Sequence, residues 1–109
     1  MNRAARSIAI GVASLWLSST SGQAQETPSF SKEQVADGAE IYAVNCAPCH
    51  GARMQDPGAA FNLRKFPPDQ RERFVNSVTR GKNAMPPWGD LLKPADVEAL
   101  WAYVVTGEK

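Results

Sequence analysis

The chain has 109 residues, of which 43% are hydrophobic, and it carries 12 lysines and arginines against 11 aspartates and glutamates. This length accommodates one small domain, and a net charge of +1 gives no basic excess of the kind that indicates a nucleic-acid partner. Two cysteines and one histidine are too few for a four-ligand structural zinc site.

The first 24 residues have the pattern of a cleaved secretory signal peptide. Arg3 and Arg6 form a basic start, a largely apolar stretch follows at 8–17, and small residues precede a cleavage point after Ala24. The apolar stretch is too short to span a bilayer, so we expect no membrane span after cleavage. We therefore expect a periplasmic protein with a flexible lead-in at 25–30 and one domain over residues 31–109.

A first helix is predicted to begin after Ser31, because Ser31 and Gln34 have the spacing of a capping box. The residues that share one face of this helix are Val35, Gly38, Ile41 and Tyr42. Glycine inside a helix costs about 1 kcal/mol relative to alanine. Gly38 therefore indicates a close crossing with another helix.

This helix leads directly into Cys46-Ala47-Pro48-Cys49-His50, a spacing typical of covalent c-type haem attachment. Each thiol can add to one haem vinyl group, and the adjacent imidazole then lies beneath the iron as an axial ligand. The alternatives are a redox-active dithiol and a structural disulfide or half of a zinc site. The helical residues before Cys46 and the histidine directly after Cys49 favour one haem c bound through both cysteines.

The middle of the chain is predicted to hold one more helix between two loops. Turn formers and small residues predict a loop at 51–60, and the prolines at 67–68 would break any helix. Asp69 and Glu72 form a second capping signature, for a helix that ends at Gly81.

A last helix is predicted to start at Pro94 and to end at Gly107. Its apolar residues at helical spacing are Val97, Leu100, Trp101 and Val104. Nowhere does the sequence alternate convincingly in the manner of a strand. We therefore expect an all-α domain of three main helices with long loops, wrapped around one covalently bound haem.

The second axial ligand of the iron is predicted by elimination. His50 is the only histidine, which excludes a second histidine from the same chain. Of the three methionines, Met1 leaves with the signal peptide and Met54 is too close to His50 to reach the far side of the haem. Met85, in a proline-stiffened loop, is the remaining candidate; the alternative is that it fills the core.

Residues 35–105 resemble a small class I cytochrome c. The residues that carry the resemblance are Gly38, Tyr42, Cys46, Cys49, His50, Gly51, Leu63, Met85, Pro86, Leu100 and Tyr103. It implies that Gly38 and Tyr42 of the first helix meet the last helix at Leu100 and Tyr103. It also implies that Leu63 packs on the haem face and that Pro86 holds the methionine loop.

For three positions near the expected haem, the sequence leaves two interpretations open. Many relatives have a proline carbonyl that accepts the hydrogen bond from the ligand imidazole, where this chain has Phe61. The acceptor is therefore the carbonyl of Phe61 or of a residue within 57–60. Arg64 either pairs with a haem propionate or is solvated, and Trp88 either lines the haem edge or covers the core.

A haem with both axial positions filled by the protein has no open site for a substrate, so we expect a one-electron carrier and no enzymatic activity. Segments 61–64 and 85–88 resemble those of cytochromes that accept electrons from periplasmic quinoprotein alcohol dehydrogenases. A dehydrogenase would then be the donor, and an oxidase or another cytochrome the acceptor. Segment 64–82 has six basic and two acidic residues, which favours an acidic partner.

Three other functions stay open at this point. The first is a haem enzyme or gas sensor with an open or labile sixth site. The second is a thiol oxidoreductase without haem, and the third is an obligate haem subunit of a dehydrogenase complex. The sequence does not separate a monomeric carrier from such a subunit.

Overall fold

The structure is a computed structural model that describes residues 9–15 and 29–108. Its elements in chain order are α1 (Lys32–Asn45), α2 (Ala47–His50), η1 (Ala52–Met54), η2 (Leu63–Lys65), α3 (Arg71–Arg80), α4 (Pro94–Ala102) and η3 (Tyr103–Gly107). Within these two ranges there is no strand, only an isolated bridge between Lys82 and Met85. The predicted all-α fold is confirmed, with the haem-motif residues forming a short helix of their own.

Most of the expected signal peptide, and most of the expected lead-in at 25–30, lies outside the described residues. Residues 9–15 are described and form neither helix nor strand. In the part of the chain that the structure describes, no helix is both long enough and apolar enough to cross a membrane.

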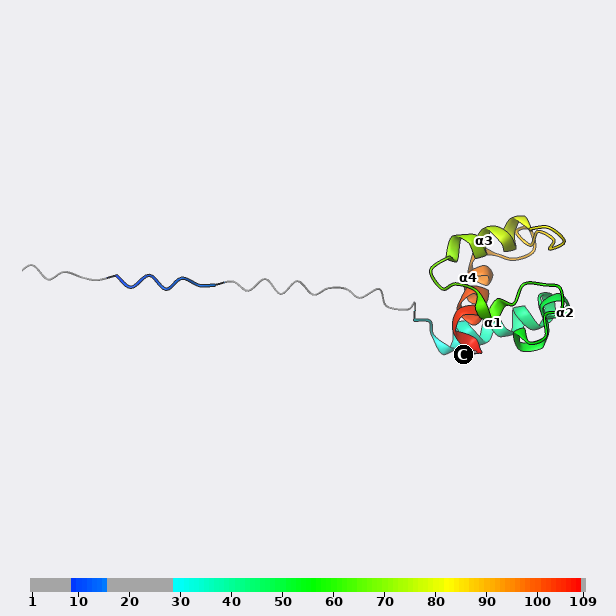
Figure 1. Cartoon of the computed structure of the whole chain (residues 1–109), viewed down its shortest axis with the longest axis horizontal. Helices are drawn as coiled ribbons and strands as arrows, with labels where there is room; N and C mark the ends of the chain where they lie inside the picture. Colours follow the sequence, from blue (N-terminus) through cyan, green and yellow to red (C-terminus); the bar gives the residue numbers. More distant parts are fainter. Residues whose placement is uncertain (1–8, 16–28, 109) are drawn as a thin grey trace, which may run out of the picture.

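The first and last helices cross in close contact at Gly38. A Cβ atom placed on Gly38 would lie 1.9 Å from the carbonyl oxygen of Ala99 in α4, so only glycine allows the two backbones to approach this closely. Next to the crossing, the rings of Tyr42 and Tyr103 have centroids 5.2 Å apart. Helix α4 lies between α1 and α3 and contacts both (Figure 1). The predicted helix crossing is therefore confirmed.

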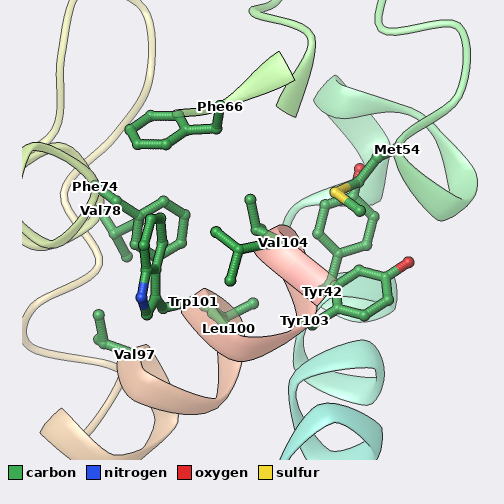
Figure 2. Close-up of a cluster of buried hydrophobic side chains, with 11 residues drawn as sticks. Tyr42, Met54, Phe66, Phe74, Val78, Val97, Leu100, Trp101, Tyr103 and Val104 are labelled. Carbon is green, nitrogen blue, oxygen red and sulfur yellow. The ribbon is translucent and has the colours of Figure 1, made fainter. Parts of the chain in front are cut away.

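The buried side chains form two groups on either side of the last helix (Figure 2). One group is mainly aromatic and includes Phe66, Phe74, Val78 and Trp101, with Val97 on the same side. The other consists of Tyr42, Met54 and Tyr103, and Leu100 and Val104 lie between the two groups. Met54 is only 1% exposed, so this methionine is a core residue.

The helix ends agree with the sequence signals in all but one place. The Ser31 hydroxyl accepts a hydrogen bond from the N–H of Gln34 at 3.1 Å, which caps α1 as predicted. Helix α3 ends at Gly81, whose φ of 77° is the left-handed conformation that glycine tolerates. Helix α4 begins at Pro94 as predicted, and its continuation η3 ends at Gly107.

The exception is the start of α3, where the predicted cap at Asp69 is wrong. The N–H of Gln70 donates to the carbonyl of Pro67 at 3.1 Å, which closes a turn with Asp69 in its central part. The helix therefore begins at Arg71, with Gln70 as its N-cap residue and no side-chain cap. The Gln70 side chain instead accepts a hydrogen bond from Arg73 at 2.7 Å.

Candidate haem site

A cavity of about 690 Å³ opens beside the last helix. Its size falls in the range of small-molecule and cofactor sites. Of the site residues predicted from the sequence, the cavity brings together Tyr42, Cys46, Cys49, His50, Leu63, Met85 and Trp88. Helices α1 to α4, the segment from 57 to 66 and the loop from 82 to 88 therefore converge on one space.

The cysteine motif reaches this cavity because the chain makes a single helical turn there. Cys46 ends α1, and its carbonyl accepts the N–H of His50 at 2.9 Å. Cys46 is partly buried and Cys49 is exposed. Burial, with a smaller contribution from Cys49, raises the pKa of the Cys46 thiol to about 11.

The imidazole of His50 is held by a backbone carbonyl of the segment from 57 to 66. Its Nδ1 atom is 3.1 Å from the carbonyl oxygen of Phe61, and the ring donates to this carbonyl when Nδ1 carries the proton. The Nε2 atom is then the one free to bind a metal. The structure thus selects Phe61 from the two readings left open by the sequence.

The segment around Phe61 is itself fixed by aromatic contacts. The Phe61 ring packs edge-on against Phe66, with centroids 5.9 Å apart. The guanidinium of Arg73 lies 5.6 Å from the Phe61 ring and 5.0 Å from the Phe66 ring. Cation–π contacts of this kind contribute about 0.5–1 kcal/mol at exposed sites. Phe61 is 47% exposed, so its ring lies at the rim of the cavity.

Met85 reaches the cavity from a loop that folds back onto α3. Lys82 and Met85 exchange two backbone hydrogen bonds of 3.0 and 2.9 Å, and the N–H of Trp88 donates to the carbonyl of Val78 at 2.8 Å. A Cβ atom on Gly81 would lie 2.7 Å from the Met85 carbonyl oxygen, so the loop packs directly on the helix end. Met85 and Trp88 both touch the core and both line the cavity. For Trp88 this combines the two interpretations that the sequence left open.

Arg64 is the one predicted site residue that is not in the cavity wall. Its Nε and Nη2 atoms donate to the carbonyl of Arg53 at 3.2 and 2.9 Å. Phe66, Arg73 and Ser77 do line the cavity but were not predicted. The helical spacing of Phe74, Ser77 and Val78 was the available signal, because it indicates which face of α3 turns inward.

The residues present fit a covalently bound haem. Two thiols, an imidazole with one nitrogen already hydrogen-bonded and a thioether sulfur share a cavity whose other walls are mainly apolar. Together they form the donor set of a c-type haem with histidine and methionine as axial ligands. This fold and site define a monohaem c-type cytochrome.

Comparison with known proteins gives the family. The model of the family described as cytochrome C oxidase, cbb3-type, subunit III matches residues 33–104. A cytochrome c6 from Microcystis aeruginosa is 39% identical over 74 residues, which cover 63% of this chain and 91% of that protein. The chain belongs to the class I c-type cytochromes. As a member of this family it binds one covalent haem c and is an electron-transfer protein rather than an enzyme.

Two larger proteins contain a related segment. The cbb3-type cytochrome c oxidase subunit FixP of Azorhizobium caulinodans is 36% identical over 99 residues, which are 84% of this chain and 32% of that subunit. The quinohemoprotein alcohol dehydrogenase ADH IIB of Pseudomonas putida is 35% identical over 79 residues, 70% of this chain and 11% of that enzyme.

Proposed function

We propose that Cys46 and Cys49 tether the haem, that His50 and Met85 fill the two axial positions of its iron, and that the protein carries single electrons in this closed state. When bound, haem c supplies an iron that gains or loses one electron. The observation that supports the proposal is that all four side chains line the same cavity. With both axial positions filled, no site remains for a substrate.

In this proposal the neighbouring residues cover the haem, exclude water from it and hold its histidine ligand in place. Tyr42, Leu63 and Trp88 line the cavity and would cover the haem, which limits the access of water. The Phe61 carbonyl holds the His50 ring in one orientation. The soft thioether of Met85 favours the ferrous state and so raises the reduction potential. A fixed site of this kind changes little between its two redox states, as electron transfer requires.

The proposed setting is the bacterial periplasm, with residues 1–24 as a cleaved signal peptide and residues 31–109 as the haem domain after the lead-in. A quinoprotein-type dehydrogenase is the proposed donor, supported by the related segment in a quinohemoprotein alcohol dehydrogenase. A respiratory oxidase or another cytochrome is the proposed acceptor, supported by the related segment in an oxidase subunit. Mass analysis of the exported protein would test the cleavage after Ala24.

The proposed docking surface is the basic part of the cavity rim, which consists of Arg73 and Lys82. Both side chains line the cavity and are exposed. Arg71 of the same helix is instead paired with Glu98. An acidic partner would be attracted to Arg73 and Lys82 and would approach the haem from this side, which steers association but is screened by salt.

Ferricyanide is a suitable anionic probe for this surface. We expect its rate of oxidising the reduced protein to fall as ionic strength rises, and to fall at low salt in Lys82→Gln. Lys65→Gln is the matched control, because Lys65 is exposed, belongs to the same basic segment and does not line the cavity. Equal rates for both variants and the original protein would contradict the docking surface.

The closed carrier is tested by potentiometric titration together with exposure of the ferrous protein to carbon monoxide. The expected result is a reversible one-electron titration and no uptake of carbon monoxide. Ready uptake of carbon monoxide would show an open sixth site and would favour the haem enzyme or gas sensor.

A further inference from the structure

The segment that follows the haem motif has an unusual backbone. Arg53, Met54 and Asp56 have φ angles of 54°, 59° and 50°, and Gly51 has 87°. Residues other than glycine adopt this left-handed region at a cost, and such a conformation persists only when the surroundings enforce it. Contacts with the rest of the molecule must therefore hold the segment from 51 to 56 in this conformation.

The first contacts come from the core. The hydroxyl of Tyr42 donates to the carbonyl of Gly51 at 2.6 Å, and the Met54 side chain is 1% exposed. These two contacts fix the segment against α1 and the core but leave the Arg53 side chain and carbonyl free to make other bonds.

The Arg53 side chain bonds to the end of the chain. Its Nη2 atom lies 2.9 Å from Oε2 of Glu108, with Nε at 3.3 Å from both carboxylate oxygens. The hydroxyl of Tyr103 donates to Oε1 of the same carboxylate at 2.9 Å. The Glu108 side chain is 13% exposed and the Arg53 side chain 71% exposed, so the pair lies at the surface with the arginine open to water.

The Arg53 carbonyl bonds to the segment that holds the histidine. It accepts two hydrogen bonds from the guanidinium of Arg64, at 3.2 and 2.9 Å. The backbone N–H of Arg64 donates to Oδ1 of Asn62 at 3.1 Å, which closes a tight turn directly after Phe61. The Phe61 carbonyl is the one that faces Nδ1 of His50.

We propose that Arg64 is a positioning residue for His50. It is the inner member of a relay in which hydrogen bonds join Glu108, Arg53 and Arg64, and the backbone of the turn at 61–64 then connects Arg64 to the Phe61 carbonyl. The relay rests on the proposed role of His50 as an iron ligand. Arg64 holds the turn at 61–64 against the strained segment, and this keeps the Phe61 carbonyl on Nδ1. The strength of that hydrogen bond sets the basicity of the imidazole and so the reduction potential.

Solvent exchange of the His50 Nδ1 proton, followed by NMR in the reduced holoprotein, reads this hydrogen bond directly. In Arg64→Leu we expect exchange about five- to tenfold faster, the effect of losing about one hydrogen bond, together with a more positive reduction potential. Arg64→Lys, which retains one donor, is expected to be intermediate. Arg53→Ala and Glu108→Gln break only the outer link and are expected to give about a twofold change.

Arg71→Leu is the matched control, because it removes an arginine that pairs with a glutamate, Glu98, outside the relay. Unchanged exchange and potential in Arg64→Leu, with only lower stability, would overturn the relay. If Arg64→Leu yields no holoprotein, Arg64→Lys and Glu108→Gln decide between the same two results. If the spectrum of the original protein shows fewer than two axial ligands, the role proposed for His50 is refuted. This outcome differs from failure of the relay, in which the original protein keeps both ligands.

Discussion

Replacing Gly38 with alanine tests the helix crossing on which the domain is built. The added Cβ would lie 1.9 Å from the Ala99 carbonyl oxygen, 2.6 Å from the Ala99 carbonyl carbon and 2.9 Å from the Tyr103 Cβ. Ordinary contact begins at 3.4 Å, so the backbones must separate by about 1.5 Å. Overpacking of this kind costs typically 1–3 kcal/mol, and a clash with backbone rather than with a flexible side chain belongs at the upper end.

Alanine is also a better helix former than glycine by about 1 kcal/mol, so we expect a net loss of about 2 kcal/mol in the free energy of unfolding. Guanidinium denaturation of the holoprotein measures this loss. The exposed α1 residue Ala43 provides the control: Ala43→Gly is expected to cost about 1 kcal/mol through helix propensity alone. A Gly38→Ala protein as stable as the original, or more stable, would refute the close crossing.

Three further predictions concern the core, the cofactor and pH. Met54→Ala is expected to cost about 2–5 kcal/mol in the free energy of unfolding, because Met54 is fully buried; a loss under 1 kcal/mol would place it outside the core. The chain with Cys46→Ser and Cys49→Ser, prepared without haem, is expected to show no cooperative unfolding by circular dichroism, because a domain this small cannot sustain a cavity of about 690 Å³. Hydrogen bonds from Arg53 and then Tyr103 lower the pKa of Glu108 below its ordinary 4.5. The carboxylate therefore stabilises the fold above pH 4.5, and this stabilisation is lost as the pH falls through the lowered pKa. Glu108→Gln should reduce the loss of stability at acid pH in denaturation experiments, and an unchanged acid loss would contradict the pairing.

Much of the fold followed from local signals in the sequence. Ser31, Gly81 and Pro94 mark helix ends through backbone chemistry that does not depend on the rest of the molecule. Asp69 had the same kind of signal, yet it lies inside the turn that the Gln70 N–H closes on the Pro67 carbonyl, so the helix begins only at Arg71. Capping patterns are reliable where nothing else constrains the backbone.

The part of the site that could be predicted from the sequence is the part whose residues are adjacent in the chain. The cysteine motif with its histidine is contiguous, and Met85 followed because the chain has few alternative ligands. Arg64 shows the limit of such reasoning. The sequence left Arg64 open between a propionate contact and a solvated side chain, and it gave no sign of the contact with the Arg53 carbonyl. That contact depends on the positive φ angles of Arg53, Met54 and Asp56, which no sequence pattern specified.

The far-red absorption of the ferric holoprotein tests most directly whether His50 and Met85 enclose the haem iron in a closed electron carrier. We predict the weak band that marks methionine sulfur on ferric haem, lost in Met85→Ala and retained in Met54→Ala, whose sulfur lies in the core. Absence of the band in the original protein, or its persistence in Met85→Ala, would contradict the ligation and with it the closed site.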